Sequence, residues 1–212
     1  MIKLDHLVFN SFQVNTYIVS DETGECVIVD PACYSEAENE NLRRYLEENR
    51  LKPVLIINTH CHIDHLLGVQ FAIDTYRIKF LAHSLEIPMI DRAPIMGDIF
   101  GFTVEPVPHP DRTLEDGEII RFGNSSLEAL LVPGHSEGSL AFYSLEGGFV
   151  ITGDALFAGS IGRTDLPGGD YDTLIESIRT KLLPLPAETE VWAGHGQPSS
   201  IGEEIRSNHF LK

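Results

Sequence analysis

The chain has 212 residues, of which 42% are hydrophobic and 22% are charged, an ordinary composition for a globular protein. Its formal net charge is −17 and its pI is about 4.8, so we expect it to bind neither nucleic acid nor an anionic membrane, because phosphate recognition needs clustered Lys and Arg. The length suits one large core, and we expect a single domain over residues 1–212 rather than two small ones.

Cysteine usage and the absence of export signals predict a cytoplasmic protein. The three cysteines, Cys26, Cys33 and Cys61, are odd in number and unevenly spaced, which is not a disulfide framework. Residues 1–24 lack a basic region followed by an apolar core, so no signal peptide is expected. No apolar run approaches the ~18 residues of a membrane span. Free thiols without an export signal favour the cytosol.

Short apolar runs in the first half of the chain alternate with helical patterns. The first three runs predict an antiparallel opening, with a turn at residues 21–24 between the last two. Leu42, Tyr45 and Leu46 recur at helical spacing and predict an amphipathic helix over 36–50. In chain order, the predicted strands lie at residues 4–9, 15–19, 26–29, 54–57 and 79–82, with a second helix over 66–77.

Residues 84–117 have no clear apolar period and contain five prolines, so we predict a long connection with about one helical turn. A connection of this length inside a domain is usually functional or contains structure that the pattern hides. Two interpretations of its apolar residues stay open: they form a lid that sets substrate shape, or they are core or a dimer contact. These residues are Met89, Ile95, Met96, Phe100 and Phe102.

The second half repeats the order of strands followed by a helix. This repetition predicts two similar α/β halves packed face to face. The predicted strands lie at residues 119–122, 127–132, 140–143, 149–152 and 190–193, and the predicted helices at 171–183 and 201–210.

Four of the predicted strands run directly into His or Asp. Loops at the ends of strands are where sites are commonly built, and glycine lets the backbone turn sharply there. The strand at 54–57 leads into T-H-C-H-I-D-H at 59–65, and the other three lead into G-H, G-D and G-H. The candidate metal ligands are therefore His60, His62, Asp64, His65, His135, Asp154 and His195.

The spacing within 59–65 indicates two metal positions. His60 and His62 point the same way in an extended stretch, whereas Cys61 between them points to the other side. Asp64 and His65 follow the turn and can face a second position. Seven His and Asp ligands suit two metals ~3.5–4 Å apart, with open positions for water, whereas a structural zinc needs four ligands and favours cysteine. The other histidines, His6, His83, His109 and His209, are interpreted as structural.

T-H-x-H-x-D-H followed by His135, Asp154 and His195 resembles the metallo-β-lactamase superfamily. The stretches G-S-I-G-R-T-D-L-P-G-G-D at 159–170 and G-H-G-Q-P-S-S-I-G-E-E at 194–204 are similar to short bacterial hydrolases related to glyoxalase II. The resemblance covers nearly the whole chain. It implies an α/β (α+β) fold, namely a four-layer αβ/βα sandwich with the site along the edge between the halves.

The resemblance also implies the ligand sets and the cofactors. One metal would be held by His60, His62 and His135, and the other by Asp64, His65 and His195, with Asp154 bridging. Asp30 matches the family's outer carboxylate and would orient a ligand histidine by accepting its other N–H. The implied cofactors are two divalent metal ions, zinc first, with iron and manganese as alternatives.

Two departures from the family pattern bear on the substrate. β-Lactamases of the superfamily often carry cysteine where this chain has Asp154, which argues against lactam hydrolysis. Glyoxalase II enzymes carry a C-terminal helical domain for glutathione, which is not expected here, and a Lys-x-Tyr motif. The matching positions are Arg163, Thr164 and Asp165. Arg163 can attract a substrate carboxylate, whereas Asp165 would repel one if it faced the site.

These features predict a binuclear metal-dependent hydrolase of a thioester such as S-lactoylglutathione, or of a related small thioester or ester. Metal coordination lowers the pKa of water from 15.7 to about 7, so a bridging hydroxide would attack the carbonyl, and Asp64 would help to orient it. No Ser or Cys nucleophile is required, and Cys61 is interpreted as a bystander.

Two alternatives stay open. One is a mono-iron oxidoreductase of the persulfide dioxygenase type on the same fold, with iron held by the residues equivalent to His60, His135 and Asp154. The other is a non-catalytic metal-binding or scaffolding protein. The sequence leaves the oligomeric state open.

Overall fold

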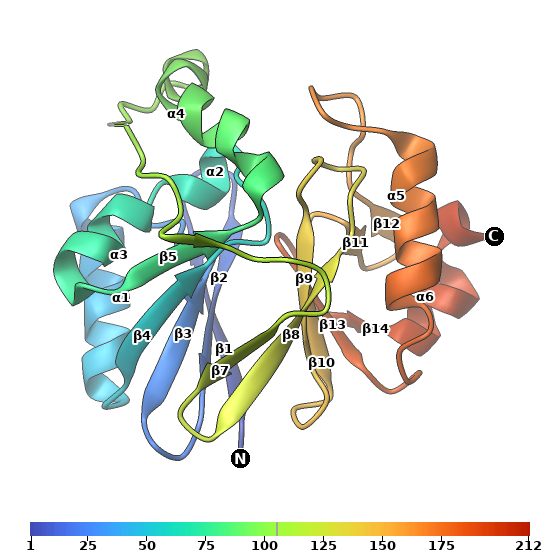
Figure 1. Cartoon of the computed structure of the whole chain (residues 1–212), viewed down its shortest axis with the longest axis horizontal. Helices are drawn as coiled ribbons and strands as arrows, with labels where there is room; N and C mark the ends of the chain where they lie inside the picture. Colours follow the sequence, from blue (N-terminus) through green and yellow to red (C-terminus); the bar gives the residue numbers. More distant parts are fainter. Residues whose placement is uncertain (105) are drawn as a thin grey trace.

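The computed structural model describes residues 1–104 and 106–212. Two six-stranded sheets face each other, and helices cover both outer faces (Figure 1). The helices α1 (Glu36–Glu48) and α3 (Val69–Tyr76) cover the first sheet, while α5 (Tyr171–Ser177) and α6 (Ile201–Ser207) cover the second. The order of layers is helix, sheet, sheet, helix, so the predicted four-layer αβ/βα sandwich is confirmed.

The first sheet has its strands in chain order. Its first three strands pair antiparallel, which confirms the predicted opening, and the pairs from β3 to β6 are parallel. Parallel pairing brings the carboxyl ends of β3, β4 and β5 to the same edge of the sheet. The strands are β1 (Lys3–Phe9), β2 (Val14–Ser20), β3 (Glu25–Val29), β4 (Lys52–Ile57), β5 (Lys79–Ala82) and β6 (Arg112–Thr113).

The second sheet has the order β14-β13-β10-β9-β8-β7, and its only parallel pair among the described residues is β10 with β13. Between the sheets, fully buried side chains such as Val29, Ile57, Phe142 and Ile151 form one core. The strands are β7 (Ile119–Phe122), β8 (Ser125–Leu131), β9 (Leu140–Ser144), β10 (Phe149–Gly153), β13 (Glu190–Ala193) and β14 (Ser199–Ser200), and β11 (Leu156–Phe157) with β12 (Ser160–Ile161) form a separate hairpin.

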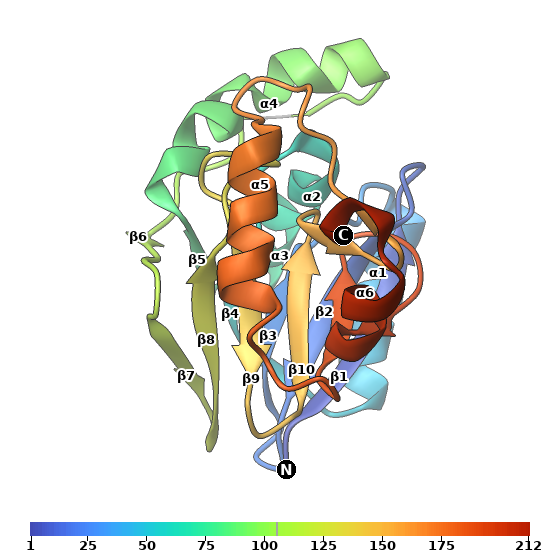
Figure 2. The same ribbon diagram turned by 90° about the vertical axis from the view of Figure 1, so that its right-hand side faces the viewer.

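The prediction of a long connection over residues 84–117 was wrong in its first part, which is helical. A short 3₁₀ turn, η1 (Ser84–Glu86), leads into the 14-residue helix α4 (Ile87–Phe100). Pro88 lies in the first turn of α4, where a backbone N–H would have no partner within the helix. Pro94 lies inside the helix. Figures 1 and 2 show α4 lying across one end of the sandwich, above the space between the sheets.

The predicted helix over 66–77 is present but begins three residues later, and a separate short helix precedes it, so its predicted start was wrong. The structure has α2 (Ile63–Leu66) and α3, separated at Gly68. A Cβ at Gly68 would lie 2.6 Å from the sulfur of Cys33 and 2.9 Å from the carbonyl oxygen of Pro31. This close approach requires glycine, and it holds the loop after β3 against the start of α3.

The other predicted elements are present with ends shifted by up to two residues, except that two of the helices end differently. The helix over 171–183 begins as α5 and continues as the π-helical η2 (Ile178–Leu182), and the last helix stops at Ser207 before the 3₁₀ turn η3 (His209–Leu211). Cys26, Cys33 and Cys61 are buried and unpaired. None of the helices that the structure describes is both long enough and apolar enough to cross a membrane.

Candidate metal centre

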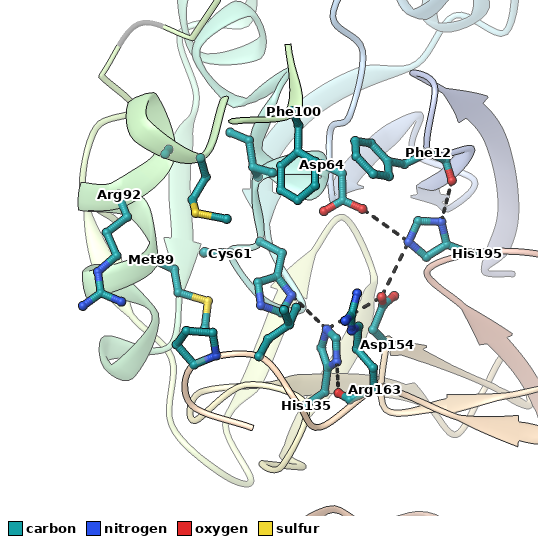
Figure 3. A pocket seen from close by; sticks show the side chains of 16 residues that line it. Phe12, Cys61, Asp64, Met89, Arg92, Phe100, His135, Asp154, Arg163 and His195 are labelled. Carbon is teal, nitrogen blue, oxygen red and sulfur yellow. Dashed lines mark hydrogen bonds and ion pairs between the residues drawn. The ribbon is translucent and has the colours of Figure 1, made fainter. Parts of the chain in front are cut away.

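The candidate site lies at one edge of the sandwich, where strand ends from both sheets meet beneath α4 (Figure 3). β4 leads to the 59–65 loop in the first sheet, and β8, β10 and β13 lead to His135, Asp154 and His195 in the second. The two sheets are joined there by a hydrogen bond from the N–H of Leu140 to the carbonyl of Thr59, at 2.7 Å. The structure thus brings together all seven candidates from four separate strand ends.

The seven side chains form two adjacent groups of three around Asp154. His60, His62 and His135 offer nitrogen atoms within 4.8 Å of one another, with His62 Nδ1 lying 2.9 Å from His135 Nε2. Asp64, His65 and His195 form the second group, in which Oδ2 of Asp64 is 3.4 Å from His195 Nε2 and 3.8 Å from His65 Nε2.

Asp154 reaches both groups with its two oxygens. Oδ1 lies 3.5 Å from Nε2 of His65, and Oδ2 lies 3.5 Å from Nε2 of His195 and 3.7 Å from Nε2 of His135. In Figure 3 the carboxylate of Asp154 lies between His135 and His195. This is the geometry that a bridging ligand requires.

Backbone carbonyls orient the two histidines of the second sheet. Nδ1 of His135 donates to the carbonyl of Arg163 at 2.8 Å, and Nδ1 of His195 donates to the carbonyl of Phe12 at 2.9 Å. In the neutral form of each ring these bonds place the proton on Nδ1, so Nε2, which faces inward, carries the lone pair.

Asp30 performs the same task for the two histidines of the first sheet. Its Oδ2 lies 3.0 Å from Nδ1 of His65 and accepts the hydroxyl of Thr59 at 2.6 Å, while Oδ1 accepts the N–H of Thr59 at 2.7 Å. The Thr59 hydroxyl in turn lies 3.1 Å from Nδ1 of His60. One fully buried carboxylate therefore fixes two rings, directly and through Thr59. Thr59, Phe12 and Arg163 were not predicted as partners of these rings, although Thr59 and Arg163 belong to the quoted motifs at 59–65 and 159–170.

The carboxylates of the site shift the pKa values of its histidines. Burial lowers the pKa of His65, but Asp64 and Asp154 outweigh burial and raise it to about 9. For His195, burial is likewise outweighed by hydrogen bonds to Asp154 and Asp64, which raise the pKa to about 10. Burial, followed by the neighbouring histidines, lowers the pKa of His60 well below its usual value. Positive charge is therefore favoured beside Asp64 and Asp154, and either protons or a cation can supply it.

The residues present fit two divalent metal ions. His60 Nε2, His65 Nε2 and Asp154 Oδ1 are buried, and none has a hydrogen-bond partner among the described residues. Buried polar atoms without partners are costly, and a bound cation would satisfy these three. Imidazole nitrogen with carboxylate oxygen is a donor set that zinc, iron and manganese accept.

Glycine lets the strand ends approach this closely. A Cβ at Gly194 would lie 2.2 Å from Oδ1 of Asp154 and 2.8 Å from Cε1 of His65. Gly194 is also held in place, since its N–H donates to the carbonyl of Gly153 at 2.8 Å. Any larger side chain at this position would displace the carboxylate of Asp154.

A cavity of about 290 Å³ opens beside the seven side chains (Figure 3). Its wall on the side of α4 is apolar and includes three of the five residues that the lid interpretation proposed: Met89, Met96 and Phe100. Ile95 is instead 64% exposed, and Phe102 is buried against Tyr34. The helix thus forms one side of the cavity, with Phe12, Leu166 and Pro167 among the other apolar residues that line it.

Two arginines also line the cavity, and they differ in their partners. Arg163, the predicted substrate-binding residue, forms a bidentate pair with Asp165, with both N–O distances at 2.7 Å. Arg92 was missed, because it lies in the stretch that had no clear period. Within the described part of the chain, no carboxylate lies within ion-pair distance of its guanidinium. Arg92 lies at the opposite end of the cavity from His195 (Figure 3).

The residues interpreted as bystanders lie apart from the seven. The side chain of Cys61 is 1% exposed and packs in an apolar cluster with Ile56 and Phe80, and burial raises the pKa of its thiol. It nevertheless touches the cavity. His83 and His109 lie near Glu115 and Asp91, respectively. His6 packs against Trp192, with ring centroids 5.5 Å apart.

Comparison with known proteins gives a consistent result. A family model described as the Metallo-beta-lactamase superfamily matches residues 10–195. The chain is 37% identical to hydroxyacylglutathione hydrolase GloC of Haemophilus influenzae, over 99% of this chain and 98% of that protein. It is 31% identical to the human mitochondrial persulfide dioxygenase ETHE1, over 91% of this chain and 68% of that protein.

Two solved structures are similar over essentially their full length. The B3 metallo-beta-lactamase BLEG-1 superposes with a TM-score of 0.90 at 33% identity, covering 100% of both chains. TTHA1623, solved in a di-iron-bound form, superposes with a TM-score of 0.87 at 36% identity, covering 98% of this chain and 100% of that one.

Proposed function

The chain belongs to the metallo-β-lactamase superfamily, and we propose that within it the protein is a binuclear metal-dependent hydrolase of small acyl thioesters, S-lactoylglutathione among them. Members of this superfamily are generally metal-dependent hydrolases. The observation that carries the proposal is the position of Asp154, whose two oxygens lie 3.5–3.7 Å from histidines of both groups. The resemblance to the hydrolase from Haemophilus influenzae supports the choice of substrate.

In this proposal the seven side chains would hold the metals, and Asp64 has a second role. His60, His62 and His135 would hold one metal, Asp64, His65 and His195 would hold the other, and Asp154 would be shared between them. Two divalent metals, when bound, supply a deprotonated water as nucleophile and Lewis acidity for the developing oxyanion and the leaving thiolate. Asp64, which lines the cavity and is 15% exposed, orients the attacking water, and Asp30 holds the histidine rings in place.

For the metal we propose zinc first, with iron and manganese as alternatives. All seven ligands are imidazoles or carboxylates, and such sets discriminate weakly among these ions. The di-iron form of TTHA1623, at 36% identity, supports iron as the main alternative. Metal analysis of protein purified without added metal, followed by reconstitution of the apoprotein with each ion, decides among them.

The cavity favours a substrate with an apolar part and a carboxylate. Met89, Met96 and Phe100 provide contact for the apolar part, and Met adapts to irregular shapes. We expect the substrate carboxylate to pair with Arg92 rather than with Arg163, because the guanidinium of Arg163 already pairs with Asp165. We therefore propose an anionic acyl thioester that extends from the metals toward Arg92.

The discriminating experiment is a panel of substrates on metal-reconstituted protein. The panel contains S-lactoylglutathione, smaller acyl thioesters with and without a carboxylate, an oxygen ester and a β-lactam. We expect turnover of thioesters that is lost on chelation and restored by metal. Turnover of the β-lactam alone would instead indicate β-lactamase activity, as the name of BLEG-1 describes for that protein.

A persulfide dioxygenase is the second candidate, and the 31% identity with human ETHE1 favours it. His60, His135 and Asp154 are the residues that would hold a single iron. The second group does not separate the two candidates, and the higher identity to the hydrolase, 37% over 98% of that protein, favours the hydrolase. Oxygen uptake with glutathione persulfide on iron-loaded protein tests this candidate. The cytosolic location, the absence of nucleic-acid and membrane partners, and a single-domain organisation stay predictions.

A further inference from the structure

Glu86 is a fully buried carboxylate at the point where η1 meets α4. Its exposed fraction is 0%. Among the residues that the structure describes, no Lys or Arg lies within ion-pair distance of it. Because a buried carboxylate is normally paired with a cation or bound to a metal, another interaction must stabilise its charge.

Hydrogen bonds from two separate loops fulfil this role. Oε2 of Glu86 accepts the N–H of Cys61 at 2.7 Å, and Oε1 accepts the hydroxyl of Ser136 at 2.7 Å and the N–H of Gly138 at 2.8 Å. Cys61 lies between His60 and His62, and Ser136 follows His135 directly. One carboxylate therefore joins the two loops that carry the first histidine group.

The packing around Glu86 leaves little freedom. A Cβ at Gly138 would lie 2.9 Å from both Cγ and Oε1 of Glu86. The hydroxyl of Ser136 is fixed in turn by Ser139, whose Oγ lies 2.6 Å away. Burial raises the pKa of the Glu86 carboxyl and the three hydrogen bonds oppose this rise, as expected for an anion held by neutral donors.

We propose that Glu86 is a positioning residue of the metal centre. It fixes the distance between the loop of His60 and His62 and the loop of His135, and thereby sets the affinity of that metal position. Because α4 begins beside it, Glu86 also couples the cavity wall to the metal ligands. The inference rests on the proposed metal site but not on the identity of the substrate.

Glu204 provides a matched control. It is also 0% exposed, and its carboxylate accepts the N–H of Gly159 at 3.0 Å and the side-chain amide of Asn208 at 2.7 Å. Neither partner adjoins a metal-ligating residue in the sequence. Substituting either glutamate by Gln removes an acceptor from a buried network, so both variants should lose stability. Only the substitution at Glu86 should change the metal site.

The experiment measures the affinity of the apoprotein for Zn²⁺ by competition with a chromophoric chelator, together with the visible spectrum of the Co²⁺-loaded protein. We expect Glu86→Gln to weaken Zn²⁺ binding at the position formed by His60, His62 and His135 by about 10- to 100-fold, the range seen when an outer partner of a metal ligand is removed. We also expect the substitution to change the Co²⁺ spectrum. Glu204→Gln should do neither. Equal affinities and spectra for the two variants would overturn the inference.

Two further outcomes also bear on the role of Glu86: a variant that does not fold, and a wild type that binds no metal. If Glu86→Gln does not fold, Ser136→Ala replaces it, because this change removes one of the three donors and leaves the carboxylate. A Zn²⁺ affinity reduced about threefold or more then supports the inference, and an unchanged affinity overturns it. If the wild-type chain binds no Zn²⁺ or Co²⁺ at all, the proposed function fails and the inference fails with it. If the wild type binds Zn²⁺ and the Glu86→Gln and Glu204→Gln variants bind it equally well, the inference fails but the proposed function stands.

Discussion

Nδ1 of His65 lies 3.0 Å from Oδ2 of Asp30, and both side chains are fully inaccessible to solvent. The same carboxylate also accepts the N–H and the hydroxyl of Thr59, so three donors point at it. Asp30→Asn would place an amide NH₂ group, itself a donor, against the N–H groups and the hydroxyl that now donate to the carboxylate. We expect this to disturb the ring of His65 directly and the ring of His60 through Thr59.

We expect Asp30→Asn to lower metal affinity by about 10- to 100-fold and to destabilise the fold by ~1–3 kcal/mol, because a buried donor loses its acceptor. Chelator competition and chemical denaturation measure the two effects separately. Wild-type affinity in a destabilised variant would assign Asp30 to stability alone.

Gly194→Ala should damage the site more than the fold. The new Cβ would lie 2.2 Å from Oδ1 of Asp154, so the carboxylate must move. We expect loss of at least one bound metal per chain, measured by elemental analysis. Gly117→Ala is the control: Gly117 has φ +76° but nothing within 4 Å of a Cβ, so it should cost ~1–2 kcal/mol through backbone strain and leave metal content unchanged. Full metal content in Gly194→Ala would show that the strand ends can separate.

Arg92 and Arg163 should differ in their effects on substrate binding. We expect Arg92→Gln to raise KM about three- to tenfold for a thioester that carries a carboxylate, with kcat and the KM of a neutral thioester little changed, because an exposed ion pair is worth ~1 kcal/mol. Arg163→Gln removes a guanidinium that is already paired with Asp165, so it should raise KM less than Arg92→Gln does. Steady-state kinetics with the paired substrates decides, and a larger effect at Arg163 would reverse the assignment.

Two buried thiols should respond only to strongly alkaline pH. Burial raises the pKa of Cys26 and of Cys33 to about 12, from an ordinary value of 9.0. Because the folded-state value is the higher one, their contribution to stability is complete below about pH 9 and is lost as pH rises toward 12. We expect negligible labelling by a disulfide reagent at pH 8 until the protein is unfolded, and a falling unfolding midpoint above pH 9. Rapid labelling of the folded protein would contradict the burial of these thiols.

The strands and the candidate ligands could be predicted because their signals are local. T-H-C-H-I-D-H sets several ligands within seven residues, and short apolar runs ending in Gly-His or Gly-Asp mark the strand ends. Helix α4 could not be predicted in the same way. Its two prolines argue against a helix, yet Pro88 falls where proline is tolerated, and the helix continues through Pro94 with Ile90 and Ala93 buried in an apolar cluster.

Long-range relationships account for the rest of what the sequence did not show. The helix predicted over 66–77 begins only after Gly68, which Pro31 and Cys33 approach from another loop. Glu86 resembles any other glutamate in the sequence, and only the fold brings Cys61 and Ser136 to it. The pairing of Arg163 is local instead: the turn brings the side chain of Asp165, two residues away, onto its guanidinium, and the substrate-binding role of Arg163 stays a prediction.

The most direct test of the central claim is metal content measured together with S-lactoylglutathione hydrolysis, in the wild type and in Asp154→Ala. We expect about two divalent metals per wild-type chain and a hydrolysis rate that falls at least ~10³-fold in the variant, since the bridging ligand holds both metals in position. A wild type that binds fewer than one metal per chain, together with an Asp154→Ala variant that hydrolyses S-lactoylglutathione at the wild-type rate, would exclude a binuclear hydrolase.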